Sequence, residues 1–269
     1  SDRWDVADNW SPPGVPWNNT AVVVPRNDTS VLVPSDYDAH AHTVTFGEDA
    51  AVVDRVFTVE ARATLTLHGG GSLMDVRHAG TTLVLRGELR GAHGGGVQVR
   101  DHAKVMHYEG GVVCDLEVGI LNSGEYVLVP GGDAEARLDT EACAQILDVH
   151  AEGELRVDTG NRARFLNSRS QLRLHGGHVM AASNDAHLDV PTILVRRTGS
   201  RLDVRTTVLD VLRVPRPNRF GRPCNQCNSF DYTYECESGT RCVPIVAHRT
   251  FELAVGRRLE LHEAATLST

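Results

Sequence analysis

One short pattern recurs along most of this chain: an aliphatic residue, a polar or variable residue, and a second aliphatic residue. It occurs as Leu65-Thr66-Leu67, Leu83-Val84-Leu85, Val97-Gln98-Val99, Leu116-Glu117-Val118, Leu147-Asp148-Val149, Leu155-Arg156-Val157, Leu172-Arg173-Leu174, Leu188-Asp189-Val190, Leu202-Asp203-Val204 and Leu212-Arg213-Val214. Side chains alternate between the two faces of a β-strand, so each triplet places its aliphatic pair on one face. The chain is therefore expected to consist of many short strands, each with one buried face.

The spacing of these triplets indicates how the strands are arranged. The steps from Leu155 to Leu172, to Leu188 and to Leu202 are 17, 16 and 14 residues, and glycines such as Gly153 precede several triplets. A coil of this length cannot bury its own inward face, so successive coils have to stack. The pattern predicts an all-β parallel β-helix (β-solenoid), in which the number of residues in each coil is in the high teens.

A β-sandwich is the alternative fold, because strands joined by hairpins also alternate. The sequence contains no Asn-Gly or Asp-Gly step, and these steps are the strongest hairpin-turn signals. Aromatic residues make up only 5% of the chain while hydrophobic residues make up 41%. An interior of Val, Leu and Ala suits narrow, regular layers, which favours the solenoid.

Charge, hydropathy and motifs exclude several classes of function. The net charge of −8 does not indicate binding to nucleic acid or anionic membranes. No run of residues approaches the ~20 apolar positions that cross a bilayer, so no membrane insertion is expected. Phosphate-binding loops, nucleophile elbows and zinc-protease motifs are absent from the sequence. We therefore expect no cofactor, no resident metal and no enzymatic activity.

The first 46 residues differ from the rest by their tryptophans and prolines. Trp4, Trp10 and Trp17 lie among Pro12, Pro13, Pro16, Pro25 and Pro34. A solenoid exposes strand edges and core at its end, and bulky rings with prolines are suited to cap it. The three tryptophans could instead stack against the apolar faces of sugars.

This region also resembles a known family. The stretch from Trp4 to Trp10, then Gly14-Val15-Pro16, Ala21-Val22-Val23-Val24-Pro25 and Val31-Leu32-Val33, is similar to the start of G8-type domains and of bacterial surface β-helix proteins. The resemblance covers about 45 residues. It implies a right-handed parallel β-helix in a secreted or cell-surface protein. No catalytic motif of those proteins can be placed on this sequence.

Four cysteines lie close together in residues 215–244, where the triplet pattern is interrupted. These are Cys224, Cys227, Cys236 and Cys242. An insertion this small cannot hold a core of its own, so two disulfides are expected to stabilise it. A zinc site is the alternative, since four thiolates can bind one ion tetrahedrally. The insertion is a candidate for contact with a partner, or it only covers strands of the solenoid.

Two further features favour an oxidising compartment. Cys114 and Cys143 complete an even set of six cysteines; they could pair across neighbouring coils or lie apart as buried thiols. Asn18 and Asn27 begin N-glycosylation sequons. Cysteine clusters and sequons together are typical of secreted proteins, so we expect an extracellular or cell-surface location.

Two groups of polar residues are candidates for chemistry. Asp36, Asp38, His40 and His42 alternate, and on an extended segment they would share one face as a divalent-metal patch; a solvated strand face is the simpler interpretation. For a polysaccharide-degrading alternative, the candidates are Asp189 and Asp203, with Arg173 or Arg205 nearby if the coils stack in register.

These interpretations give four segments: an N-terminal cap in residues 1–46, solenoid coils in 47–214, the Cys-rich insertion in 215–244, and a resumed coil in 245–269. The last coil is expected to continue in a longer parent protein. The predicted function is a non-enzymatic structural or adhesive module of an extracellular filament, wall or appendage. Its expected partners are other subunits or copies of itself, and extracellular glycans in the alternative of a carbohydrate-binding module.

Overall fold

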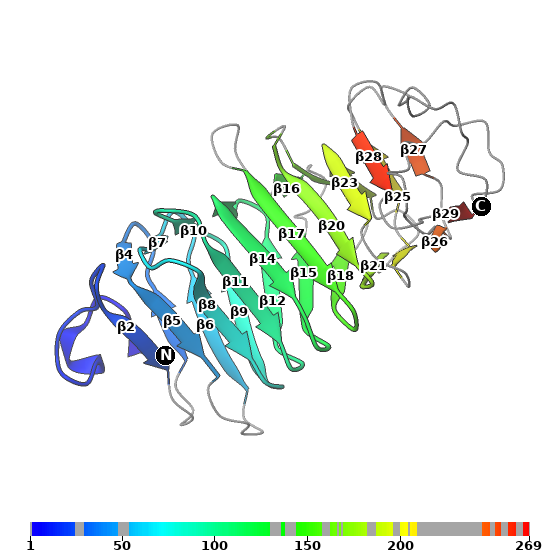
Figure 1. The fold of residues 1–269 in the computed structure, drawn as a ribbon. Helices are drawn as coiled ribbons and strands as arrows, with labels where there is room; N and C mark the ends of the chain where they lie inside the picture. Colours follow the sequence, from blue (N-terminus) through cyan, green and yellow to red (C-terminus); the bar gives the residue numbers. More distant parts are fainter. Residues whose placement is uncertain are drawn as a thin grey trace.

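A computed structural model describes most of the N-terminal three quarters of the chain and shorter stretches after it. These are residues 2–24, 30–47, 54–129, 136–137, 144–157, 162–165, 167, 169–181, 187–195, 200–203, 205–208, 244–247, 251–253, 258–261 and 266–268. Within them, all regular secondary structure is β except one short 3-10 turn, η1 (Ala7–Asn9). The two ends of the chain lie at opposite ends of a stack of strands (Figure 1).

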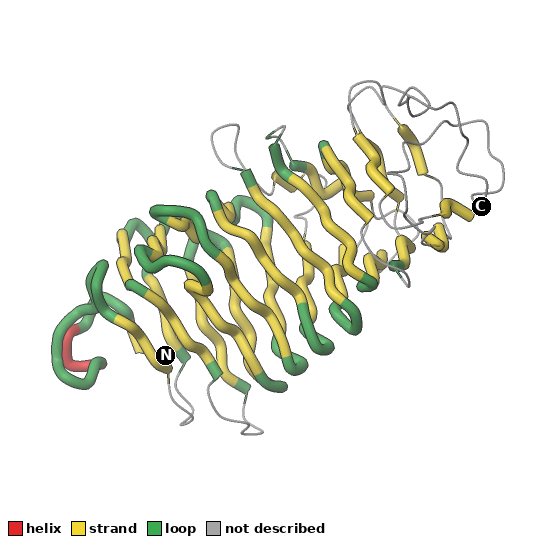
Figure 2. Tube along the Cα trace, viewed as in Figure 1, coloured by secondary structure: helices red, strands yellow, loops and turns green. Residues whose placement is uncertain are grey.

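Three faces of parallel strands surround one interior (Figures 1 and 2). Face A comprises β1 (Asp2–Arg3), β3 (Val31–Val33), β6 (Arg55–Val59), β9 (Thr81–Leu85), β12 (Lys104–Tyr108), β15 (Glu125–Val129), β18 (Glu154–Val157), β21 (His178–Ala181), β24 (Arg201–Asp203), β26 (Pro244–Ala247) and β29 (Thr266–Ser268). Face B comprises β2 (Ala21–Val24), β5 (Thr43–Phe46), β8 (Ser72–Arg77), β11 (Gly96–Arg100), β14 (Leu116–Ile120), β17 (Gln145–His150), β20 (Gln171–His175), β23 (Thr192–Val195) and β28 (Arg258–Leu261).

Face C consists of two sheets in succession. The first contains β4 (Asp38–Ala41), β7 (Thr64–Leu67), β10 (Glu88–Gly91) and β13 (Val112–Cys114), and the second contains β16 (Ala136–Arg137), β19 (Arg162–Arg164), β22 (His187–Val190), β25 (Arg205–Val208) and β27 (Phe251–Leu253). Along the described residues, every ladder between these strands is parallel. The predicted parallel β-solenoid is therefore confirmed, and the hairpin-based sandwich is excluded.

The coils are longer than the sequence intervals suggested. On face A, Val105 pairs with Tyr126, 21 residues further on, and Tyr126 pairs with Leu155, 29 residues further on. The predicted length in the high teens was wrong because Leu155 and Leu172 lie on faces A and B of the solenoid. Each interval spans two of the three strands of a coil, since β19 on face C lies between Leu155 and Leu172, whereas a full coil contains strands from all three faces.

The aliphatic pairs of the triplets form the core. In the eight triplets from Leu65-Thr66-Leu67 to Leu188-Asp189-Val190, both aliphatic side chains are at most 2% exposed. They belong to one apolar cluster that extends from Trp4 to Ile193. Full burial of each such side chain contributes about 1.5–3 kcal/mol, so the stacked pairs are the main source of stability. The triplet at residues 212–214 lies outside the described residues.

Small residues at the corners allow the coils to stack closely. Gly124 and Gly153 immediately precede β15 and β18, at the same corner of successive coils. A Cβ atom at Gly124 would collide with the carbonyl oxygen of Val99, and one at Gly153 would collide with that of Ile120. Glycine is needed here because the backbone of the preceding coil occupies the position of a side chain.

The tryptophan-rich N-terminus covers the first coil. Trp4 is completely buried, and its ring packs edge-on against Trp10 at 4.9 Å and Phe57 at 6.0 Å. The indole N–H of Trp10 donates to the backbone carbonyl of Trp4 at 3.0 Å. Residues 1–46 also contain β1 to β5, which pair with the solenoid sheets. The cap is thus continuous with the coils rather than a separate unit.

The triplet pattern is interrupted near the C-terminus, in an interval between two strands of face A. Leu202 of β24 pairs with Ala247 of β26, 45 residues further on, and β26 pairs with β29. The predicted Cys-rich insertion belongs to this interval, but residues 215–243 lie outside the described residues. No helix in the described part of the chain is long and apolar enough to cross a membrane.

Candidate functional site

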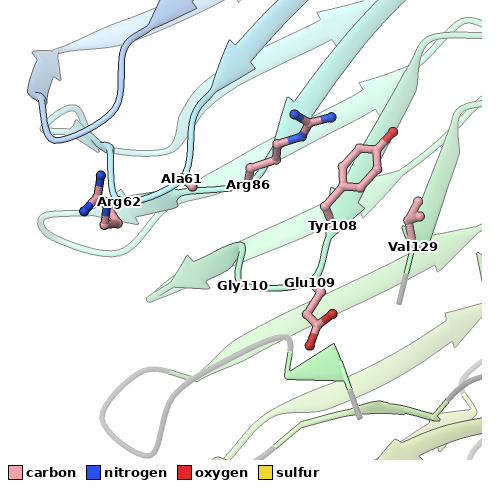
Figure 3. Close-up of a pocket in the computed structure, with 7 residues that line it drawn as sticks. All are labelled: Ala61, Arg62, Arg86, Tyr108, Glu109, Gly110 and Val129. Atoms are coloured by element: carbon pink, nitrogen blue, oxygen red, sulfur yellow. The ribbon is translucent and has the colours of Figure 1, made fainter. Parts of the chain in front are cut away.

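An open groove lies at one edge of face A (Figure 3). It has a volume of about 590 Å³, within the usual range for small-ligand sites. Its lining residues come from the ends of face-A strands and the turns that follow: Ala61, Arg62, Arg86, Tyr108, Glu109, Gly110 and Val129. We refer to these seven residues as the face-A groove.

Strand register brings the lining residues together. Tyr108 and Val129 are partners in neighbouring strands, and Arg86 follows Leu85, whose partner directly precedes Tyr108. The three outward side chains therefore form one row across three coils. Arg62 reaches the groove from the turn after β6. The residues of this row are 21 or 22 positions apart, so the groove depends on the coil length.

The groove combines a cation with an aromatic ring. The Arg86 guanidinium lies 4.8 Å from the centre of the Tyr108 ring, in cation–π contact (Figure 3). Arg62 is exposed and forms a 2.9 Å ion pair with the exposed Asp36. Such exposed contacts each contribute about 1 kcal/mol or less, so both guanidinium groups can turn to another partner at small cost. A ligand with an anionic group and an apolar face fits this surface.

A second polar cluster lies on the outside of face B. Arg173 lies 3.5 Å from the carboxylate of Glu117 and 3.6 Å from that of Asp148. The Nε2 atom of His175 is 3.1 Å from Asp148, whose carboxylate is almost completely buried. We refer to Glu117, Asp148, Arg173 and His175 as the face-B ion cluster.

The two carboxyl groups of the face-B ion cluster lie close enough to affect each other. A hydrogen bond with Asp148, followed by burial, raises the pKa of Glu117, while Arg173 opposes the shift. The ring of His150 stacks on that of His175, with centroids 4.7 Å apart and planes 9° apart. The cluster links β14, β17 and β20, so it connects three successive coils from the outside.

The acidic residues chosen from the sequence do not gather in one place. Asp189 lies on face C and is buried, whereas Asp203 lies on face A. Arg173 lies on face B and Arg205 on face C. The polysaccharide-degrading alternative required the coils to stack so that these residues share a face, and the structure places them on three different faces. The structure instead places Arg173 beside Glu117 and Asp148, a grouping that only the register reveals.

The three tryptophans have different environments. Trp4 is in the core and Trp10 is partly buried against it. Trp17 is 58% exposed, and its ring contacts that of His40 at 4.6 Å. The three rings therefore do not form one sugar-stacking platform, and Trp17 alone presents most of its surface to solvent.

The candidate modification and disulfide sites lie only partly within the described residues. Asn18 is exposed in a turn, where a sequon would be accessible, and Asn27 lies outside the described residues. Cys114 is buried and is not a free thiol. Its predicted partner Cys143 lies outside the described residues, so this pairing stays a prediction. The same holds for the four cysteines of the insertion: Cys224, Cys227, Cys236 and Cys242.

The predicted divalent-metal patch is divided between a strand and the turn before it. Asp38 and His40 lie on β4, whereas Asp36 has a φ of 61° and pairs with Arg62. His42 follows the end of the strand. Among the described residues, no group of three or more His, Cys, Asp or Glu side chains is arranged to hold a metal ion. The segment is therefore not extended throughout, which the arrangement of all four side chains on one face would have required.

Comparisons with known proteins add little to this description. No protein-family model and no curated protein matches the sequence. Among solved structures, the chain is similar to one described as a TibC-catalysed, hyper-glycosylated fragment of TibA, with 14% identity over 94% of this chain and 99% of that chain. The TM-score is 0.20, so the backbones superpose poorly and nothing about fold or function rests on this match. The resemblance to G8-type domains stays an interpretation of the N-terminal residues.

Proposed function

We propose that this chain is a non-enzymatic structural or adhesive module of an extracellular or cell-surface protein. In this role it is a rigid unit of a filament, wall or appendage. The observation that carries the proposal is the stacking of three parallel faces around one apolar core that extends from Trp4 to Ile193. A solenoid of this kind holds its two ends at a constant separation, because each coil is packed against its neighbours.

Ion pairs on the outside of the stack support a rigid role. Glu125 lies 3.0 Å from Lys104 and 3.9 Å from Arg156, so one carboxylate connects three successive coils of face A. On face B, Arg100 forms a two-bond pair with Asp75 of the preceding coil, at 3.0 and 2.6 Å. Each bridge is weak alone, but together they oppose the sliding of one coil past the next.

The capped N-terminus suggests how copies or partner subunits would meet. Trp4 and Trp10 pack against the apolar core at this end of the stack, so the core itself is not open to another chain there. Contacts with other copies or other subunits would then use the lateral faces. The exposed Asn18 and the buried Cys114, which is not a free thiol, support an extracellular setting.

Solution scattering and sedimentation test the structural role. The purified chain is expected to scatter as an elongated, inflexible particle and to form larger ordered assemblies as its concentration rises. Secretion from a eukaryotic cell should add a glycan that is removed by Asn18→Gln or Asn27→Gln. A compact or flexible particle would contradict the proposed rod. A strictly monomeric protein at all concentrations would contradict the filament.

A second candidate function is the binding of an acidic polysaccharide in the face-A groove. The observation that favours it is the Arg86 guanidinium over the Tyr108 ring, beside the exposed Arg62. Carboxylates or sulfates of the polymer would pair with the arginines, and a sugar ring would pack on the tyrosine. This function is compatible with an adhesive module.

Binding to a panel of polysaccharides tests the second candidate. Acidic polymers such as polygalacturonate or alginate are expected to bind, and neutral glucans are not. Arg86→Gln and Tyr108→Ala should each weaken binding at least tenfold, whereas Arg90→Gln, an exposed arginine on β10, should not. Equal loss in the Arg90 variant would indicate non-specific charge attraction, and no binding by the unaltered chain would reject the candidate.

A further inference from the structure

Two histidine rings from successive coils lie in contact on face C. His40 belongs to β4, and His68 directly follows β7. The parallel register of these strands brings together residues that are 28 positions apart. The Nδ1 atom of His40 is 3.0 Å from the Nε2 atom of His68, so the two rings face each other through these nitrogens.

The distance between these nitrogens suits a shared metal ion. Two imidazole nitrogens bound at about 2.0–2.1 Å lie about 2.9 Å apart at a right angle and about 3.4 Å apart at the tetrahedral angle. The observed 3.0 Å lies near the right-angle value. Right-angle geometry with nitrogen ligands is typical of copper(II) and nickel(II), which are also the tightest-binding divalent ions of the first transition row.

We propose that His40 and His68 form a two-histidine site for copper(II) or nickel(II), with water completing the coordination. The ion would take the place of the proton that otherwise lies between the two nitrogens. It would connect two coils near the capped end of the solenoid.

Asp38 holds His40 in the required orientation. Its carboxylate lies 3.5 Å from Nε2 of His40, the nitrogen that does not face His68. A carboxylate beside one imidazole nitrogen favours the proton there and leaves the other nitrogen free to bind a metal. Asp38 is thus a positioning residue rather than a ligand.

His42 and His93 lie close enough to His68 for their charges to act on its ring, so they are included in the test.

Trp17 provides a direct optical readout. Its exposed ring contacts the ring of His40 at 4.6 Å, so a copper(II) ion on His40 would quench its fluorescence. Titration of the full chain with copper(II) chloride and nickel(II) chloride should give saturable quenching at one ion per chain. Trp17→Phe should abolish most of the change, and calorimetry of that variant should still detect binding.

Substitutions separate this site from other histidines. His40→Gln and His68→Gln should each weaken binding at least tenfold, and Asp38→Asn should weaken it less. His102→Gln is the matched control, since His102 is exposed on a turn of another corner, and it should bind as the unaltered chain does. His42→Gln and His93→Gln should retain the saturable quenching.

Two outcomes would overturn the inference. Binding that survives in the double variant of His40 and His68 would place the ion elsewhere. Absence of saturable binding in the unaltered chain would show that the two rings share only an N–H···N hydrogen bond. Circular dichroism on each variant would establish that the solenoid is still folded.

Discussion

The Nδ1 atom of His107 lies 2.8 Å from the hydroxyl oxygen of Tyr126, and both side chains are buried inside the solenoid. The Tyr126 hydroxyl also accepts a 3.2 Å hydrogen bond from the side-chain amide of Gln145. The hydroxyl can donate to His107 only while Nδ1 is unprotonated. Burial accordingly lowers the pKa of His107 to about 4, so the core contains a neutral imidazole.

We expect the solenoid to lose stability as the pH falls from about 6.5 toward about 4. The pKa of His107 is lower in the folded chain than in the unfolded chain, so the unfolded chain takes up the proton first. A shift of this size contributes up to about 3 kcal/mol above pH 6.5, which is lost across this interval. Urea unfolding at a series of pH values measures the effect.

A substitution at His107 tests whether this residue is the source of the acid sensitivity. His107→Leu should lower stability at pH 7, because the Tyr126 hydroxyl loses its acceptor, but should flatten the dependence between pH 6.5 and 4. His102→Gln, at an exposed turn, should keep the full dependence. An unchanged slope in the His107 variant would assign the acid sensitivity to other groups.

Gly153→Ala should destabilise the fold by about 1–3 kcal/mol, since the added methyl group collides with the carbonyl oxygen of Ile120 in the preceding coil. Gly70→Ala is a suitable control, because a Cβ atom there has no neighbour within 4 Å. Thermal unfolding of the two variants measures the difference. Similar melting temperatures would show that the corner can widen without cost.

Trp4→Ala should destabilise the chain by about 3–5 kcal/mol, as for other buried aromatic side chains. Trp17→Ala should change stability by less than about 0.5 kcal/mol, since its ring is mostly exposed. Chemical unfolding of both variants compares the cap residue with the surface residue. A small effect at Trp4 would mean that the first coil does not depend on the cap.

Asp148→Asn should destabilise the fold by about 1–3 kcal/mol, because Arg173 and His175 lose their shared, buried carboxylate.

Glu117→Gln should have a different effect, one that depends on pH. The pKa of Glu117 is raised in the folded chain, so its contribution is present at low pH and is lost as the pH rises through the folded pKa. Glutamine keeps a hydrogen-bond donor at every pH.

The Glu117 variant should therefore gain stability over the original chain as the pH rises. Unfolding curves at pH 4 and pH 8 test this sign. A variant that is less stable than the original chain at pH 8 would show that the Glu117 carboxylate is held by Arg173 rather than by a proton shared with Asp148.

The local pattern predicted the strands but not their neighbours. Leu147 and Val149 were expected to point inward, and both are buried. Alternation predicts which side chains of a strand point into the core. It does not predict whether the strand belongs to face A, face B or face C. For that reason alternation could not decide whether Asp189 and Asp203 lie together, and the contact of Arg86 with Tyr108 could not be predicted.

The sequence by itself determined the all-β class, the inward set of aliphatic side chains and the parallel stacking, because alternation and the need to bury one face are local properties of a strand. Only the tertiary structure decided which outward residues meet. The coil length varies from 21 to 29 residues between Val105 and Leu155, and a change of one residue moves a side chain to the other face of a strand. The pairing of His40 with His68 and of Glu117 with Asp148 therefore follows from the register of whole coils, which no short segment contains.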